Sequence, residues 1–131
     1  MRVAVLGPGG VGGLIAGALQ RAGTEVVIVA REQTATAISA HGLRVRSVSL
    51  GEWVAHPPAV HRLDEPVDAL IVATKASGLE PALERIAVEP ALVLPLLNGL
   101  DHLEVLRERF GAEAVLAGSI RVEADRPQTG V

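Results

Sequence analysis

A glycine-rich turn near the N-terminus constrains the fold of this chain more than any other feature. Gly7, Gly9 and Gly12 have the spacing G-x-G-x-x-G. A short apolar run ends at the first of these glycines, and apolar residues recur at helical spacing from Val11 onward. A second run, rich in β-branched residues, occupies residues 25–30. The N-terminal segment therefore predicts a strand, a tight turn, a helix and a second, parallel strand, which together form a βαβ unit.

The remaining sequence continues this alternation of strand-like and helix-like segments. Further helices are expected at residues 31–41, 78–86 and 101–110. Further strands are expected at residues 67–73, 92–97 and 114–119, with short strands in residues 43–54 around a possible turn at Gly51 and a loop or edge strand in residues 57–66. We therefore predict an α/β fold in which residues 1–131 form one domain. Its core is a doubly wound (Rossmann-type), mostly parallel sheet with helices on both faces.

Charge and composition exclude several classes of protein. The net charge of -3 gives no electrostatic reason to expect nucleic acid or an anionic membrane as a partner. The absence of cysteine excludes disulfides and zinc–thiolate sites, and metal-ligand spacing is absent among His41, His56, His61 and His102. The uncharged run at residues 3–19 has the character of a signal or membrane segment, but its glycines disfavour a continuous helix. We expect a cytoplasmic protein without a metal site.

The glycines of the turn match the steric needs of a bound dinucleotide. The first allows a tight turn, the second lets a pyrophosphate approach the backbone, and the third lets the helix pack closely on the strand. Backbone N–H groups and the positive dipole end of the helix then bind the phosphates. The predicted cofactor contacts of the turn are Gly7, Pro8, Gly9, Gly10, Val11 and Gly12. The alternative is a glycine turn that serves packing alone.

The end of the second strand indicates which dinucleotide binds. Sites that take NAD carry an acidic residue about 20 residues after the glycines. Glu32 fits that position by counting, whereas Arg31 is the first residue beyond the strand. A guanidinium binds a 2′-phosphate with paired hydrogen bonds, whereas an acid repels it. We favour Arg31 and NADP(H), while Glu32 keeps two alternatives open: NAD binding, or a solvated Arg–Glu pair at a helix start.

Two polar residues stand out because each is the only one of its type. Lys75 is the only lysine and follows the strand expected at residues 67–73, and Asn98 is the only asparagine and follows the strand expected at residues 92–97. Ligands bind at the carboxyl ends of strands in open α/β sheets. Lys75 can therefore pair with a phosphate or a substrate carboxylate, and Asn98 can bind a substrate or the nicotinamide ribose. A surface lysine and an Asn-Gly turn are the alternatives.

Four segments, in this order, resemble the N-terminal half of the ketopantoate reductase (2-dehydropantoate 2-reductase) family. They are residues 5–12, 23–31, 73–76 and 97–101. The resemblance implies an oxidoreductase that uses NADPH to reduce a 2-keto acid to a 2-hydroxy acid in pantothenate biosynthesis. It also implies that Arg31 contacts the 2′-phosphate and that Lys75 and Asn98 lie at the cleft for cofactor and substrate. Ala124 is implied as a backbone contact near the nicotinamide.

The resemblance also predicts a limit to the chemistry of this chain. In the family, the proton-donating lysine and several substrate-binding residues belong to a C-terminal helical domain, and this chain ends at Val131. We therefore expect the chain alone to bind NADPH and to reduce ketopantoate negligibly. The alternatives are a regulatory or sensing NADP(H)-binding module without catalysis and another NADP-linked dehydrogenase. The expected partner is a small 2-keto acid, and a homodimer is compatible with the sequence.

Overall fold

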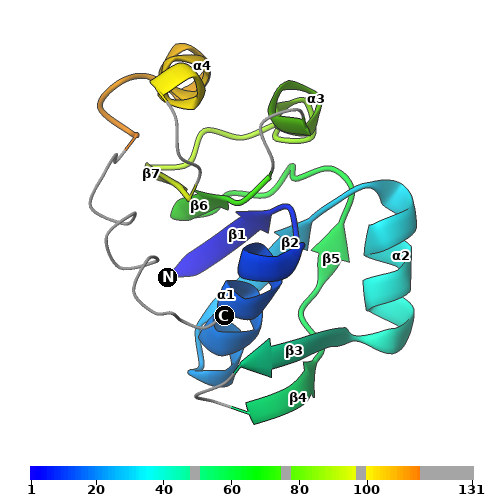
Figure 1. Cartoon of the computed structure of the whole chain (residues 1–131). Coiled ribbons are helices and arrows are strands. Elements are labelled where there is room, and N and C mark those ends of the chain that lie inside the picture. The colour runs from blue at the N-terminus through cyan, green and yellow to red at the C-terminus, as the bar shows by residue number, and fades with distance from the viewer. Residues whose placement is uncertain (48–50, 75–77, 97–99, 116–131) are drawn as a thin grey trace.

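Strands and helices alternate along the part of the chain that the computed structural model describes, which is residues 1–47, 51–74, 78–96 and 100–115. The strands are β1 (Arg2–Leu6), β2 (Glu25–Val29), β3 (Leu43–Ser47), β4 (Gly51–Ala55), β5 (Ala59–Val60), β6 (Ala69–Val72) and β7 (Leu92–Pro95). The helices are α1 (Gly10–Arg21), α2 (Glu32–His41), α3 (Leu79–Leu83) and α4 (Leu100–Phe110). Figure 1 shows their arrangement.

Five of the strands form one parallel sheet in the order β5-β2-β1-β6-β7. From β1 the chain winds outward through β2 to β5, and then returns to the other side of β1 and continues through β6 to β7. The winding direction therefore reverses between β1 and β6, where Leu6 pairs with Val72. This order confirms the predicted doubly wound, Rossmann-type fold. Connections diverge at such a reversal and leave room for a ligand at the carboxyl ends of the strands.

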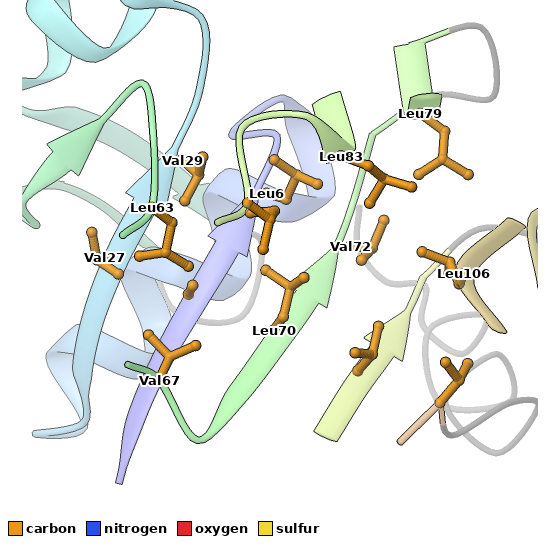
Figure 2. Close-up of a cluster of buried hydrophobic side chains, with 14 residues drawn as sticks. Leu6, Val27, Val29, Leu63, Val67, Leu70, Val72, Leu79, Leu83 and Leu106 are labelled. Atoms are coloured by element: carbon orange, nitrogen blue, oxygen red, sulfur yellow. The ribbon is translucent and has the colours of Figure 1, made fainter. Parts of the chain in front are cut away.

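Helices cover both faces of this sheet. On one face, Leu79 and Leu83 of α3 and Leu106 of α4 join a buried cluster with alternate residues of the strands. Figure 2 shows this cluster, in which leucine and valine side chains fill the space between the strands and the two helices. On the other face, Ala16 of α1 and Ile38 of α2 join a second buried cluster. Burial on both faces explains why the strands are continuous runs of aliphatic residues.

The uncharged N-terminal run, residues 3–19, divides into β1, the glycine turn and most of α1. Among the described residues, no helix combines the length and the apolar character that crossing a membrane requires. The run is therefore explained by burial of β1 in the centre of the sheet.

A hairpin of β3 and β4 forms a separate two-stranded sheet that packs on α1. A Cβ on Gly17 would overlap Cγ2 of Val45, so the glycine lets the hairpin approach the helix closely. The sequence predicts Gly51 as the turn, whereas in the structure it is the first residue of β4, with a φ of 88°. Pairing thus extends to the end of the hairpin, and the connecting residues 48–50 lie outside the described residues.

The third helix is shorter than predicted, because α3 ends at Leu83 and not at Ile86. The backbone beyond it bonds to a distant segment. The N–H of Leu63 donates to the carbonyl of Arg85 at 2.7 Å, and the N–H of Ala87 donates to the carbonyl of Leu63 at 2.8 Å. These two bonds form a parallel bridge that replaces the last helical turn.

Only the beginning of the last predicted strand, residues 114–119, falls within the described residues. Val115 forms an isolated parallel bridge with Val93 of β7. The N–H of Val93 also donates to the carbonyl of Ala114 at 2.8 Å. The chain therefore returns to the edge of the sheet beside β7, and the rest of this predicted strand stays a prediction.

Candidate functional site

The glycine turn connects β1 to α1 at the point where the sheet reverses its winding. Gly7 has a φ of 90°, a left-handed conformation that L side chains rarely adopt. Its N–H donates to the carbonyl of Val29 at 3.0 Å, and a Cβ added to it would stand 2.9 Å from Cγ2 of Thr74. The turn is thus held between the ends of β2 and β6, and both its backbone angle and the close approach require glycine.

The other two glycines of the motif differ sharply in what surrounds them. A Cβ on Gly12 would overlap the carbonyl oxygen of Gly7 and would stand 2.9 Å from Cβ of Ala73. A Cβ on Gly9 would meet no atom of the described structure within 4 Å. Gly12 therefore serves the packing of α1 against the strands, while the space over Gly9 is open to a ligand.

The N-terminus of α1 presents backbone donors at the same point. Gly9 is the N-cap residue, and within the described residues no side chain caps this helix. The N–H of Gly13 makes the bond to the carbonyl of Gly9 at 2.9 Å, so the N–H groups before it have no carbonyl partner within the helix. Together with the positive end of the helix dipole, such donors form an anion-binding site.

A cleft of about 650 Å³ lies over the carboxyl ends of β1, β2 and β6. Three segments surround it: the glycine turn, the end of β2 with the first turn of α2, and a segment we call the α3 wall, which comprises Gly78, Pro81, Ala82 and Arg85. The described residues that line it are Leu6, Gly7, Pro8, Gly9, Val11, Val29, Ala30, Arg31, Thr34, Ala73, Thr74, Gly78, Pro81, Ala82 and Arg85. This volume lies within the range of roughly 300–1,000 Å³ that is typical of ligand and cofactor sites.

The structure separates the two candidate residues at the end of β2. Arg31 is the N-cap residue of α2 and lines the cleft, whereas Glu32 is absent from the described lining residues. Thr34, one helical turn further on, also lines the cleft. At this strand end, the described lining of the cleft therefore includes an arginine and a threonine, and no acidic residue.

The charged residues in the described lining of the cleft are two arginines. Arg31 precedes α2 on one face of the sheet, and Arg85 follows α3 on the other. The remaining lining residues are glycines, prolines, aliphatic residues and two threonines. Of these, Thr74 has a buried Oγ1 without a hydrogen-bond partner among the described residues. A cleft with apolar surfaces and cations suits a ligand that combines a planar ring with phosphate groups.

The sequence-predicted site residues are only partly described by the structure. Gly7, Pro8, Gly9, Val11 and Arg31 all line the cleft. The other two predicted turn residues lie in α1. Gly10 is the first residue of this helix, and Gly12 packs it closely against Gly7 and Ala73. The other predicted residues, Lys75, Asn98 and Ala124, lie outside the described residues.

Sequence reasoning missed the α3 wall and Thr34. The position of Thr34, one helical turn after Arg31, is a signal that could have identified it. Arg85 carries no such signal, because the sequence predicts only that it lies in the helix expected at residues 78–86. Its place at the cleft follows from the bridge to Leu63, which only the tertiary structure shows.

Comparison with known proteins gives a consistent result along nearly the whole chain. The family profile described as ketopantoate reductase PanE/ApbA matches residues 3–131. A 2-dehydropantoate 2-reductase of Halobacterium salinarum is 32% identical over 144 aligned positions, which cover 100% of this chain and 45% of the relative. An uncharacterized oxidoreductase of Bacillus subtilis, YkpB, is 32% identical over 129 residues, which cover 95% of this chain and 42% of the relative. The chain thus spans less than half the length of these curated relatives.

Solved structures share the same architecture. The ternary structure of D-mandelate dehydrogenase with NADH and anilino(oxo)acetate matches with a TM-score of 0.78 and 28% identity, over 88% of this chain and 39% of that chain. A PanE/ApbA family ketopantoate reductase from Ralstonia eutropha JMP134 matches with a TM-score of 0.70 and 31% identity, over 85% of this chain and 39% of that chain. In both cases, the matched region is less than half of the larger enzyme.

Proposed function

This chain belongs to the ketopantoate reductase family, whose profile matches residues 3–131, and on that premise we propose that it is the NADPH-binding domain of a 2-dehydropantoate 2-reductase-like oxidoreductase. The proposed reaction reduces a 2-keto acid to a 2-hydroxy acid in pantothenate biosynthesis. Bound NADPH supplies the hydride that the keto carbon accepts. The residues of this chain bind and orient that cofactor.

The observation that supports this proposal best is that Arg31 lines the same cleft as the glycine turn. The open space over Gly9 and the N-terminus of α1 suit the pyrophosphate. Arg31 and Thr34 offer a charged fork and a hydroxyl group for a 2′-phosphate on the adenosine ribose. The absence of Glu32 from the described lining supports NADPH as the proposed cofactor.

The nicotinamide end of the site depends on residues outside the described structure. We assign Lys75 and Asn98 to the cleft for nicotinamide and substrate, and Ala124 to a backbone contact with the cofactor, from their place in the sequence and the family resemblance. We likewise propose from the family that the protein takes part in reducing the keto acid; this chain spans less than half the length of its curated relatives. Location in the cytoplasm and assembly as a homodimer stay predictions.

One structural neighbour favours a second candidate function. D-mandelate dehydrogenase resembles this chain at a TM-score of 0.78 and carries NADH in its structure. The second candidate is therefore an NADH-dependent 2-hydroxy acid dehydrogenase, in which Glu32 accepts hydrogen bonds from the adenosine ribose. Both candidates interconvert a 2-keto acid and a 2-hydroxy acid, so the cofactor distinguishes them.

Titration of this chain with NADPH and with NADH tests the proposal. We expect NADPH to bind more tightly, because a 2′-phosphate gains charge-assisted hydrogen bonds from Arg31. Arg31→Ala should weaken NADPH binding by about 1.5–3 kcal/mol, roughly 10- to 150-fold, and should leave NADH binding little changed. Isothermal titration calorimetry measures both affinities.

An exposed arginine outside the described lining of the cleft provides a matched control. Arg107 lies in the last turn of α4 and is absent from the described lining of the cleft. Arg107→Ala removes the same charge and should change neither affinity. Equal losses for both dinucleotides in Arg31→Ala would remove Arg31 from the 2′-phosphate role. Tighter binding of NADH by the unaltered chain would support the second candidate.

A further inference from the structure

The α3 wall contributes a second cation to the cleft. Arg85 and Arg31 both line it, from segments on different faces of the sheet, and the described lining contains no acidic residue. Among the described residues, Arg2, Arg46 and Arg109 form ion pairs with glutamates, whereas neither cleft arginine does. Two arginines without a carboxylate partner among the described residues, beside one cavity, suit an anionic ligand.

Arg85 is held in a defined position. Its Nη1 donates to the carbonyl of His61 at 3.2 Å, and its own carbonyl accepts the N–H of Leu63 at 2.7 Å. The side chain and the backbone of Arg85 are therefore both tied to the segment that follows β5. A guanidinium that is already oriented loses less side-chain entropy when it binds a ligand.

The strand that precedes this segment, β5, is bonded to the end of β2. The N–H of Ala30 donates to the carbonyl of Val60 at 3.0 Å, so the ends of β2 and β5 lie side by side. Arg31 follows the end of β2. His61, whose carbonyl accepts the hydrogen bond from Arg85, follows the end of β5. The anchor of Arg85 thus lies next to the strand end from which Arg31 enters the cleft.

The position of this anchor distinguishes between the phosphates of a dinucleotide. In the strand order β5-β2-β1, β2 separates the end of β5 from the glycine turn that follows β1. Two strand spacings correspond to roughly 10 Å. The guanidinium of Arg85 is therefore held on the side of the cleft where Arg31 lies, away from the pyrophosphate position over Gly9.

We propose that Arg85 and Arg31 form a two-arginine clamp for the 2′-phosphate of NADPH, in which each guanidinium approaches from a different wall of the cleft. This inference rests on the proposed NADPH function and adds a specificity-determining residue to it. A phosphate monoester carries about two negative charges at neutral pH, which matches two guanidinium groups. Stacking of Arg85 on the adenine is the competing role, and it would serve NADH and NADPH equally.

Affinity measurements on Arg85 variants test the clamp. We expect Arg85→Ala to weaken NADPH binding about tenfold and to leave NADH binding within about twofold. Arg85→Lys keeps the charge but loses the planar fork, so its affinity for NADPH should lie between that of the unaltered chain and that of Arg85→Ala. In Arg31→Ala/Arg85→Ala, NADPH and NADH should bind equally. Arg62→Ala is the matched control, because Arg62 is exposed, lies next to His61 and is absent from the described lining.

The outcomes separate this inference from the proposed function. If the unaltered chain binds NADPH no more tightly than NADH, the proposed NADPH function fails. If Arg31→Ala loses the preference for NADPH but Arg85→Ala and Arg85→Lys keep it in full, only the clamp is wrong. Equal losses for NADPH and NADH in both Arg85 variants would assign Arg85 to the adenine instead. Urea unfolding of each variant identifies any loss that comes from the broken bond to His61, and Arg85→Lys then provides the decisive comparison.

Discussion

The glycine turn and the α3 wall line the same cleft, but different kinds of interaction place them there. The turn is one contiguous segment, and atoms of the turn itself, together with the ends of β2 and β6, explain why Gly7 and Gly12 are glycines. The α3 wall depends on the pairing of β5 with β2 and on the bridge from Leu63 to the segment after α3. The backbone that lines the cleft at the glycine turn is thus set by a local motif, while the arginine of the α3 wall reaches the cleft through contacts between distant segments.

The largest expected effect is the loss of the turn itself. Gly12→Ala places a Cβ against the carbonyl oxygen of Gly7 and 2.9 Å from Cβ of Ala73, and backbone atoms cannot move aside easily. We expect the free energy of unfolding to fall by about 3 kcal/mol, because overpacking exceeds the roughly 1 kcal/mol gained in helix propensity. Urea denaturation measures the change. A variant as stable as the unaltered chain would show that the turn tolerates a side chain.

Gly9→Ala, in the same motif, should lower the affinity for the cofactor while changing the stability of the fold little. Its Cβ meets no described atom within 4 Å, so only the weaker N-cap preference of alanine acts on stability, at about 1 kcal/mol or less. We expect NADPH and NADH affinity to fall by at least about tenfold, because the methyl group occupies the space assigned to the pyrophosphate. Calorimetric titration of both cofactors checks this. Unchanged affinities would place the pyrophosphate elsewhere.

The smallest expected effect concerns an arginine that supports the α3 wall without lining the cleft. Arg109 donates through Nη2 to the carbonyl of Ile86 at 2.8 Å and pairs through Nη1 with Glu89 at 2.7 Å. Arg109→Ala should lower the free energy of unfolding by about 1 kcal/mol. The ratio of NADPH to NADH affinity should change less than twofold, since Arg85 keeps its bond to His61. A large change in that ratio would show that the position of Arg85 depends on α4.

Much of the fold could be predicted because its signals are local. The aliphatic runs of β1 and β2, the helical spacing after Val11 and the glycines that end helices are each contained in a few consecutive residues. One of these predictions differs from the structure because a distant partner takes over the backbone. The helix expected to reach Ile86 ends at Leu83 because the following peptide groups bond to Leu63.

The residues of the candidate site also form two groups: those that the local sequence identifies and those that only the tertiary structure identifies. The glycine turn and Arg31 could be named from the sequence, since both follow predicted strands directly. The choice between Arg31 and Glu32 stays a prediction, and the structure adds only that Arg31, and not Glu32, is among the described lining residues of the cleft. Arg85 required the tertiary structure, since no periodicity or spacing connects residue 85 with residue 31.

The sequence by itself therefore determined the doubly wound alternation of strands and helices and the position of the glycine turn, because backbone conformation and strand burial depend on the residues nearby. Only the tertiary structure decided which side chains meet over the strand ends. Parallel pairing brings the ends of β2, β5 and β6 together from segments far apart in sequence, and hydrogen bonds between those segments set where Arg85 stands. The glycine turn and Arg31 thus follow from local sequence, while the place of Arg85 beside the same cleft follows from tertiary contacts.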